Sequence, residues 1–192
     1  MKIPRILFIC LGGLTQSYAQ VPGYQPIITA ALATSATLTN VSCRAYVGTN
    51  ASNAILGFAV TGPAGSDIEV LVRGVGPTLS RFGQTGLLGQ PVLTLFDSSG
   101  KQLVANTGWG TNANATQISA ASVLAGAFAL PSGSADSALL VTLTPGNYTA
   151  VVAGLNNSTG LALIEVYGVP PPALPSPPAP GQSVATPLAG NG

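Results

Sequence analysis

The sequence predicts an all-β protein: a β-sandwich or jelly-roll-like domain with one short helix, between an extended N-terminal arm and a Pro-rich C-terminal tail. Three observations favour this fold class. Short segments alternate apolar and polar residues with a period of two, Gly, Pro and Asn separate them at regular spacing, and only one segment has helical spacing. We expect the sandwich domain over residues 38–168.

Each expected strand is a short run with strand periodicity, bounded by turn residues. In the first, Val41, Cys43 and Ala45 alternate with polar neighbours. The turn at 97–100 (DSSG) joins two strands and predicts a hairpin. The second expected strand has Leu56, Phe58 and Val60 on its inner face. The other expected strands are 38–47, 68–75, 91–96, 101–105, 138–143, 148–153 and 161–169.

One helix is expected from residue 117 to about residue 125, where apolar residues recur at helical spacing. Asn114 or Thr116 can cap its start, and Gly126 and Pro131 follow as stop signals. The loop before it, 106–114, carries Trp109, the only tryptophan.

The first 19 residues have the three parts of a secretory signal peptide. Lys2 and Arg5 supply the positive region, 6–14 are apolar, and 17–19 end in small residues at the positions a signal peptidase inspects. The sequence therefore predicts a secreted or cell-surface protein. No later stretch approaches the ~20 apolar residues that a membrane span needs, so none is expected in the mature chain.

Two cysteines bear on processing and packing. Cys10 suggests a lipoprotein, but Ile9 stands before it where a small residue is required, and the cysteine lies inside the apolar run. Signal cleavage after Ala19 leaves Cys43 as the only cysteine, so no internal disulfide is expected. We expect Cys43 to be a small buried side chain, with an intermolecular bridge as the alternative.

The segments that flank the domain differ from it in composition. The arm, 20–37, contains the uncharged segment 27–32 (IITAAL), whose Ile27, Ile28, Ala30 and Leu32 are the candidate self-association residues. The tail, 169–192, is rich in proline, which favours a stiff polyproline II spacer over a packed core.

Low charge limits the partners of this chain. Charged residues make up 6% of it, against ~25% in a typical soluble domain. No basic patch exists for phosphates, so nucleic acid is not an expected partner. Neutral surfaces repel one another weakly, which favours association with further copies or with other cell-surface components.

Catalytic chemistry has few candidates here. The sequence has no histidine, which removes a Ser-His-Asp triad and a Cys-His pair. A Ser-Lys dyad would need Lys101, expected in an exposed turn. The acidic residues read as turn, loop or strand-surface positions, and neither a catalytic pair nor a calcium site is assigned to them: Asp67, Glu69, Asp97, Asp136 and Glu165. We predict no catalytic residue, no metal site and no cofactor.

Two further motifs have a structural and a functional interpretation. The segment 73–77 (RGVGP) resembles the start of a phosphate-binding loop, but the third glycine is missing, Pro77 removes an amide donor and no helix is expected next. Its glycines are better explained by a bulge or corner. Trp109 between two glycines is either a sugar-stacking platform or, as we expect, an aromatic that plugs the end of the sandwich.

Several motifs together carry a family resemblance: VRGVGPTL (72–79), PVLTLFDSSG (91–100), GWG (108–110), PGNYTA (145–150) and ALIEVY (162–167). They resemble a repeat domain of large secreted proteins of environmental bacteria. The second half is also similar to the accessory β-sandwich modules (pre-peptidase C-terminal-like domains) of exported peptidases. The resemblance covers roughly residues 38–168 and implies a secreted β-sandwich with no established catalytic role.

The sequence thus favours a secreted, non-enzymatic structural protein that assembles into a filament or matrix. The apolar arm would add as a strand to an open sheet edge of a neighbouring copy, and a head-to-tail contact of this kind builds a fibre. The alternatives for the arm are packing on its own domain and a disordered leader. The alternative is an adhesive module that binds polysaccharide or a surface partner through Trp109. An enzyme of unusual mechanism is the third hypothesis.

Overall fold

The computed structural model describes residues 40–50 and 52–170. The predicted signal peptide, the arm with Ile27, Ile28, Ala30 and Leu32, and the tail from residue 171 lie outside the described residues. The described part contains eight strands and one α-helix: β1 (Asn40–Val47), β2 (Ala54–Val60), β3 (Ile68–Val75), β4 (Pro91–Asp97), β5 (Gln102–Asn106), α1 (Ala115–Leu124), β6 (Ser137–Leu143), β7 (Gly146–Gly154) and β8 (Gly160–Gly168).

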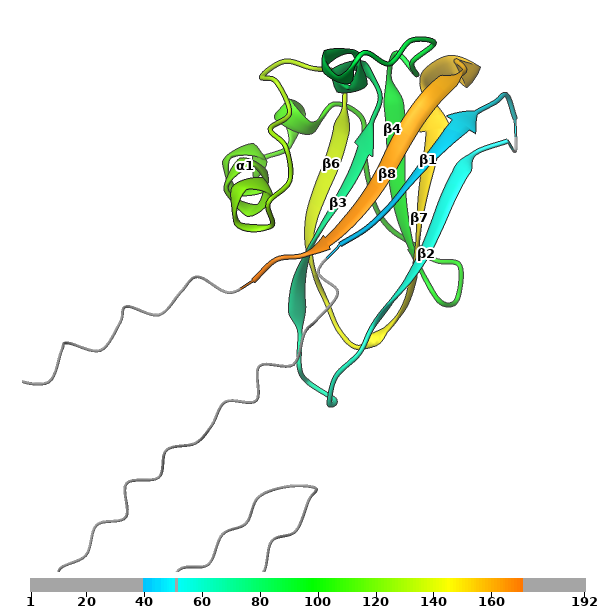
Figure 1. Cartoon of the computed structure of the whole chain (residues 1–192). Coiled ribbons are helices and arrows are strands. Elements are labelled where there is room, and N and C mark those ends of the chain that lie inside the picture. Colours follow the sequence, from blue (N-terminus) through cyan, green and yellow to red (C-terminus); the bar gives the residue numbers. More distant parts are fainter. Residues whose placement is uncertain (1–39, 51, 171–192) are drawn as a thin grey trace, which may run out of the picture. The chain divides into compact units, whose positions relative to one another are not determined.

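The strands form two antiparallel sheets of four (Figure 1). Sheet A has the order β1-β8-β3-β6, and sheet B has the order β2-β7-β4-β5. Apart from the β4–β5 hairpin, consecutive strands alternate between the sheets, which is the connectivity of a jelly roll. The all-β prediction and the eight expected strands are confirmed.

The main core fills the space between the sheets. Strand periodicity turns every second side chain inward, so Val70 and Val72 of sheet A meet Leu93, Leu95 and other inner residues of sheet B. These core positions are those that the alternating pattern predicts, including the inner face of β2.

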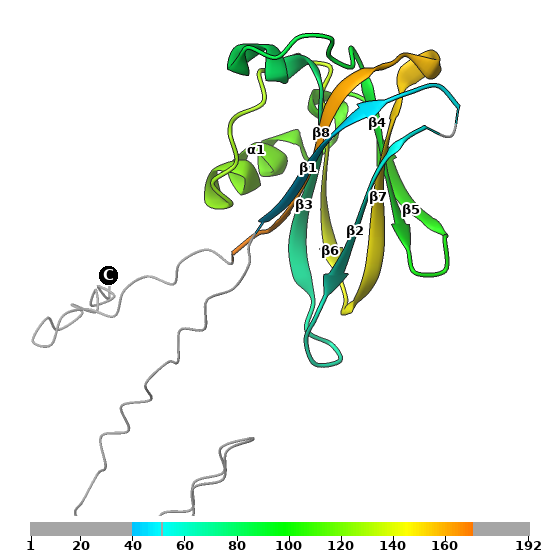
Figure 2. The same ribbon diagram turned by 45° about the vertical axis from the view of Figure 1, so that its right-hand side comes forward.

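A second core covers the outer face of sheet A. The chain between β5 and β6 passes over β3 and β6 and places α1 there, as Figures 1 and 2 show. Ile118 of α1 packs with Leu71, Val75 and Tyr167 of the sheet. The helix is confirmed near its predicted limits, but the sequence did not reveal that it hides one face of the sandwich.

Cys43 is exposed, so the prediction that it is buried is wrong. It shares the inward-facing side of β1 with Ala45 and Val47. Because β1 is an edge strand, the first half of this face extends beyond the region that sheet B covers, and strand alternation alone cannot distinguish an edge strand from a central one.

Candidate functional site

Arg73 and Glu165 form an ion pair on the outer face of sheet A, beneath the segment between β5 and β6 that contains α1; this segment is called the cover below. They are opposite one another on β3 and β8, and Arg73 Nε lies 3.0 Å from Glu165 Oε2, without the alignment of a hydrogen bond. The Tyr167 hydroxyl donates to Glu165 Oε1 at 2.8 Å. Arg73 Nη1 donates to the carbonyl of Phe128 at 2.7 Å, and the guanidinium carbon lies 4.2 Å from the centre of the Phe128 ring.

Burial of this cluster corrects the strand-surface position expected for Glu165. Its face is the outer one, but Glu165 is 4% and its cross-strand partner Arg73 is 0% exposed. Burial lowers the pKa of Arg73, while the charge of Glu165 opposes that shift. Burial and the hydrogen bond to Glu165 raise the pKa of Tyr167. A pair without solvent access holds the cover on the sheet and offers no substrate a route to it.

Asp136 is also a buried structural carboxylate. Its Oδ1 accepts from the amides of Gly76 at 2.8 Å and Thr78 at 3.3 Å, and its Oδ2 accepts from the Thr78 hydroxyl. Its carbonyl accepts from the amide of Trp109 at 2.7 Å. The residue predicted in a loop before β6 therefore fastens the corner after β3 to the tryptophan loop.

The corner at 73–77 is built by close backbone approach, as the structural interpretation predicted. A Cβ on Gly76 would lie 2.1 Å from the carbonyl oxygen of Leu88, so no side chain fits there. A 3₁₀ helix, Pro77–Phe82, does follow, although no helix was expected. The amides of Gly76 and Thr78 are occupied by Asp136, which leaves them unavailable to a phosphate.

Trp109 is a plug, which was the preferred of its two interpretations. Its side chain belongs to the core under the cover and the residue is 9% exposed, too little for an open stacking platform. The indole nitrogen donates to the Pro131 carbonyl at 3.2 Å and to the Ser134 hydroxyl at 3.1 Å.

A shallow cleft of about 760 Å³ borders the edge of Trp109. Its lining has no charged side chain and is dominated by small residues and hydroxyls, among them Thr107, Thr111, Thr116 and Ser119. Such a surface can form hydrogen bonds with a neutral ligand but supplies no acid, base or metal ligand.

Asp97 has a structural role in a turn. Asp97 Oδ1 accepts from the amides of Ser99 and Lys101 and from the Ser99 hydroxyl, the closing contacts of the predicted hairpin turn. The hydrogen bond from the Ser99 hydroxyl contributes most to lowering the pKa of Asp97. Within residues 40–50 and 52–170, no three His, Cys, Asp or Glu side chains gather as metal ligands would. None of the helices in that part of the chain is long and apolar enough to cross a membrane.

The strand edges differ between the two sides of the sandwich. The outer edge of β6 is covered by asparagine side chains: Asn112 donates to the carbonyl of Ala138 at 2.8 Å, and Asn106 accepts from the amide of Ala138 at 3.1 Å. At the opposite side, β1 and β2 each pair with one neighbour only. Among the described residues, no side chain bonds to the backbone of β2. The β1/β2 side is therefore open to a further strand.

The strands β1 and β2 separate toward the start of β1 and the end of β2 (Figure 2). A groove of about 370 Å³ lies between them and reaches the inner residues of β3 and β8. Two inward-facing aliphatic side chains at its mouth remain substantially exposed, Val41 at 37% and Ile68 at 39%. The groove has no charged residue in its lining. The main core is thus incompletely covered at this place.

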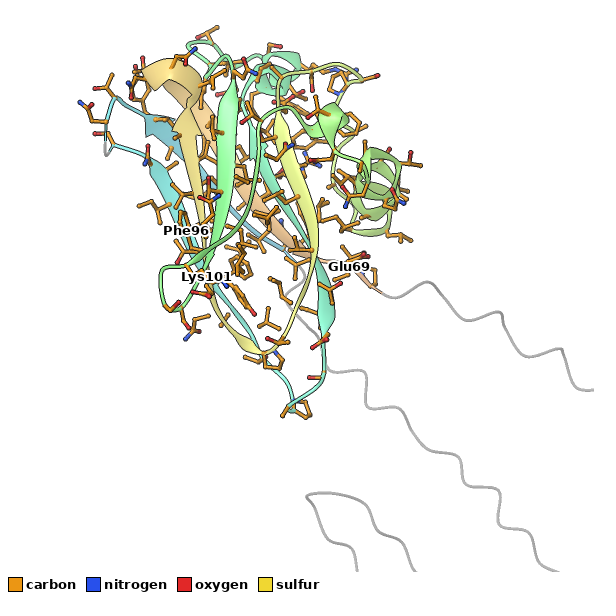
Figure 3. All side chains as sticks on the ribbon, turned by 180° about the vertical axis from the view of Figure 1, so that it is seen from behind. Glu69, Phe96 and Lys101 are labelled. Atoms are coloured by element: carbon orange, nitrogen blue, oxygen red, sulfur yellow. The ribbon has the colours of Figure 1, made fainter. Side chains whose placement is uncertain are left out.

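The outward positions of β2, β4 and β7 on sheet B carry no charged side chain. They hold mainly aliphatic residues and threonine, with Asn147 and with Phe96, which Figure 3 labels near Lys101 of the hairpin. Among the described residues, no helix covers this face. Ile55 on this face is 62% exposed. Exposed apolar surface of this kind favours contact with another protein surface.

No protein-family model matches this chain, and no curated protein matches it. Among the described residues the geometry provides one buried ion pair, a neutral cleft beside Trp109 and an open side of the sandwich at β1 and β2.

Proposed function

We propose that this chain is a secreted, non-enzymatic structural subunit that self-associates by strand addition into an extracellular filament or matrix. The donor is the N-terminal arm of one copy, and the acceptor is an open sheet edge of the next. The open β1/β2 side is the observation that carries this proposal, because a free strand edge next to exposed apolar side chains is a template for pairing with another chain.

Two further features support self-association. The low content of charged residues, 6% of the chain, lowers the electrostatic cost of bringing copies together. The buried ionisable side chains serve the fold: Arg73 pairs with Glu165, and Asp136 accepts hydrogen bonds from the corner after β3. Export rests on the signal-peptide pattern of residues 1–19, and the family resemblance to secreted sandwich modules agrees with it.

Electron microscopy of the secreted protein tests the proposal. Fibres or sheets are expected from the chain that begins at Gln20, and their loss is expected when residues 20–35 are deleted. Assemblies that persist unchanged without the arm would contradict strand addition by this segment.

The cleft next to Trp109 favours a second candidate, an adhesive module for neutral polysaccharide. Its hydroxyl-rich, uncharged lining fits the many hydroxyls of a sugar better than a charged ligand. Binding on an array of neutral glycans that disappears in Thr116→Arg, which fills the cleft from an exposed position, would support this candidate. An array without any bound glycan would count against it.

A further inference from the structure

We propose that the groove between β1 and β2 is the acceptor site, and that residues 27–32 of a second copy add to the edge of β2 with Ile28, Ala30 and Leu32 facing into the groove. This inference rests on the proposed function and specifies which edge and which side chains perform the assembly.

The lining of the groove indicates the pairing edge. β2 contributes four consecutive residues, 57–60, whereas β1 contributes only Asn40 and Val41. Side chains alone would contribute alternate positions, because successive residues of a strand point to opposite faces. Four consecutive residues mean that the backbone of β2 borders the groove, and Gly57, which has no side chain, leaves that backbone accessible.

The interior of the groove indicates the chemistry of the occupant. Val60, Val70 and Val166 belong to the main core, and Val41, Phe58 and Ile68 line the groove with them. Its volume of about 370 Å³ is at the small end of ligand pockets, ~300–1,000 Å³. A few aliphatic side chains without charge are therefore the suitable occupant.

Residues 27–32 have this composition. In an extended segment Ile28, Ala30 and Leu32 share one face, and Ile27, Thr29 and Ala31 share the other. The first face is wholly aliphatic and the second includes a hydroxyl. The orientation with Ile28, Ala30 and Leu32 inward thus buries the more apolar face.

The position of the groove relative to the chain favours a second copy over the same copy. Asn40, the first described residue, lines the groove. Folding back into its own groove would require a reversal within residues 33–39 (ATSATLT), which contain no Gly, Pro, Asn or Asp. Extended, these seven residues can span up to about 23–25 Å, a reach that is sufficient for contact with a second copy.

A cross-linking experiment on the chain from Gln20 tests the site directly. The photoreactive amino acid p-benzoylphenylalanine replaces Val41 at the mouth of the groove, and unlabelled chain is mixed with ¹⁵N-labelled chain before irradiation. The expected product joins the groove to residues 27–32 and contains both isotopes. Products that map elsewhere, or that never combine isotopes, would overturn the proposal; the second result would place the arm in its own groove.

Matched lysine variants provide an independent readout. Val41→Lys puts an inward-pointing charge in the groove, a device by which natural edge strands prevent pairing. Val123→Lys makes the same change on α1, where the side chain is 76% exposed. We expect Val41→Lys to weaken self-association by about tenfold or more, since this requires only ~1.4 kcal/mol, and Val123→Lys to leave it unchanged. Circular dichroism confirms that both variants fold.

Synthetic peptides of residues 25–34 (QPIITAALAT) separate the site from the assembly. The unmodified peptide and a Thr29→Asp peptide are expected to inhibit assembly of the full chain, and an Ile28→Asp peptide is not. If the arm is required for assembly but Val41→Lys and all three peptides have no effect, the proposed function stands and this acceptor site is wrong. If the chain never assembles, the proposed function itself is wrong.

Discussion

Removing the negative charge of Glu165 should destabilise the domain strongly although the side chain keeps its shape. In Glu165→Gln the amide can still accept the hydrogen bond from Tyr167, but Arg73 loses its counter-charge in a place that is 0% exposed. Breaking one partner of a buried ion pair costs about 3–5 kcal/mol. For a domain of this size that corresponds to a decrease in Tm of roughly 10–20 °C.

Urea denaturation of Glu165→Gln and Glu69→Gln side by side measures this cost. Glu69, labelled in Figure 3, lies on the same strand as Arg73 but is exposed. Its substitution should therefore change the free energy of unfolding by less than about 0.5 kcal/mol. The double variant Arg73→Met/Glu165→Leu should recover part of the lost stability, because no charge stays buried, although the Tyr167 hydroxyl and the Phe128 carbonyl lose their partners. Equal, small effects of the two single variants would refute the structural role of the pair.

Three other predictions concern single residues. Gly76→Ala should lower the free energy of unfolding by about 1–3 kcal/mol in thermal unfolding, because the Cβ would meet the Leu88 carbonyl. Gly89→Ala is the control, since a Cβ there meets nothing within 4 Å. Equal melting temperatures of the two variants would contradict the close approach at Gly76. The thiol of Cys43 should react with Ellman's reagent in the folded chain as completely as in urea; protection in the monomer would contradict its exposure. Trp109→Phe should cost about 1–3 kcal/mol in chemical denaturation, since it removes a buried donor and leaves two acceptors unpaired, and an unchanged midpoint would argue against the plug.

Local patterns in the sequence were sufficient for most of the fold. Strand alternation identified β1, β2 and β3, and short runs between turn residues identified the later strands. The DSSG turn identified the β4–β5 hairpin, and helical spacing identified α1. Each of these signals depends on residues within a few positions of one another, which is why one sequence reveals them.

The environment of each face could not be predicted in this way. Arg73 and Glu165 alternate with core residues as surface charges do, and only the packing of the 106–136 connection on sheet A buries them. Cys43 shows the reverse error, because its inward orientation was evident but its position on an edge strand was not. The order of strands in each sheet is a long-range property, and it determines which edges remain open.

The open β1/β2 side serves the proposed function only if copies of the chain associate through the N-terminal arm. Sedimentation velocity of the chain from Gln20 over a wide concentration range measures this most directly, with the chain lacking residues 20–35 as comparison. Open-ended oligomers that grow with concentration and disappear on deletion are the predicted result. A chain that sediments as a monomer at every concentration would contradict the account.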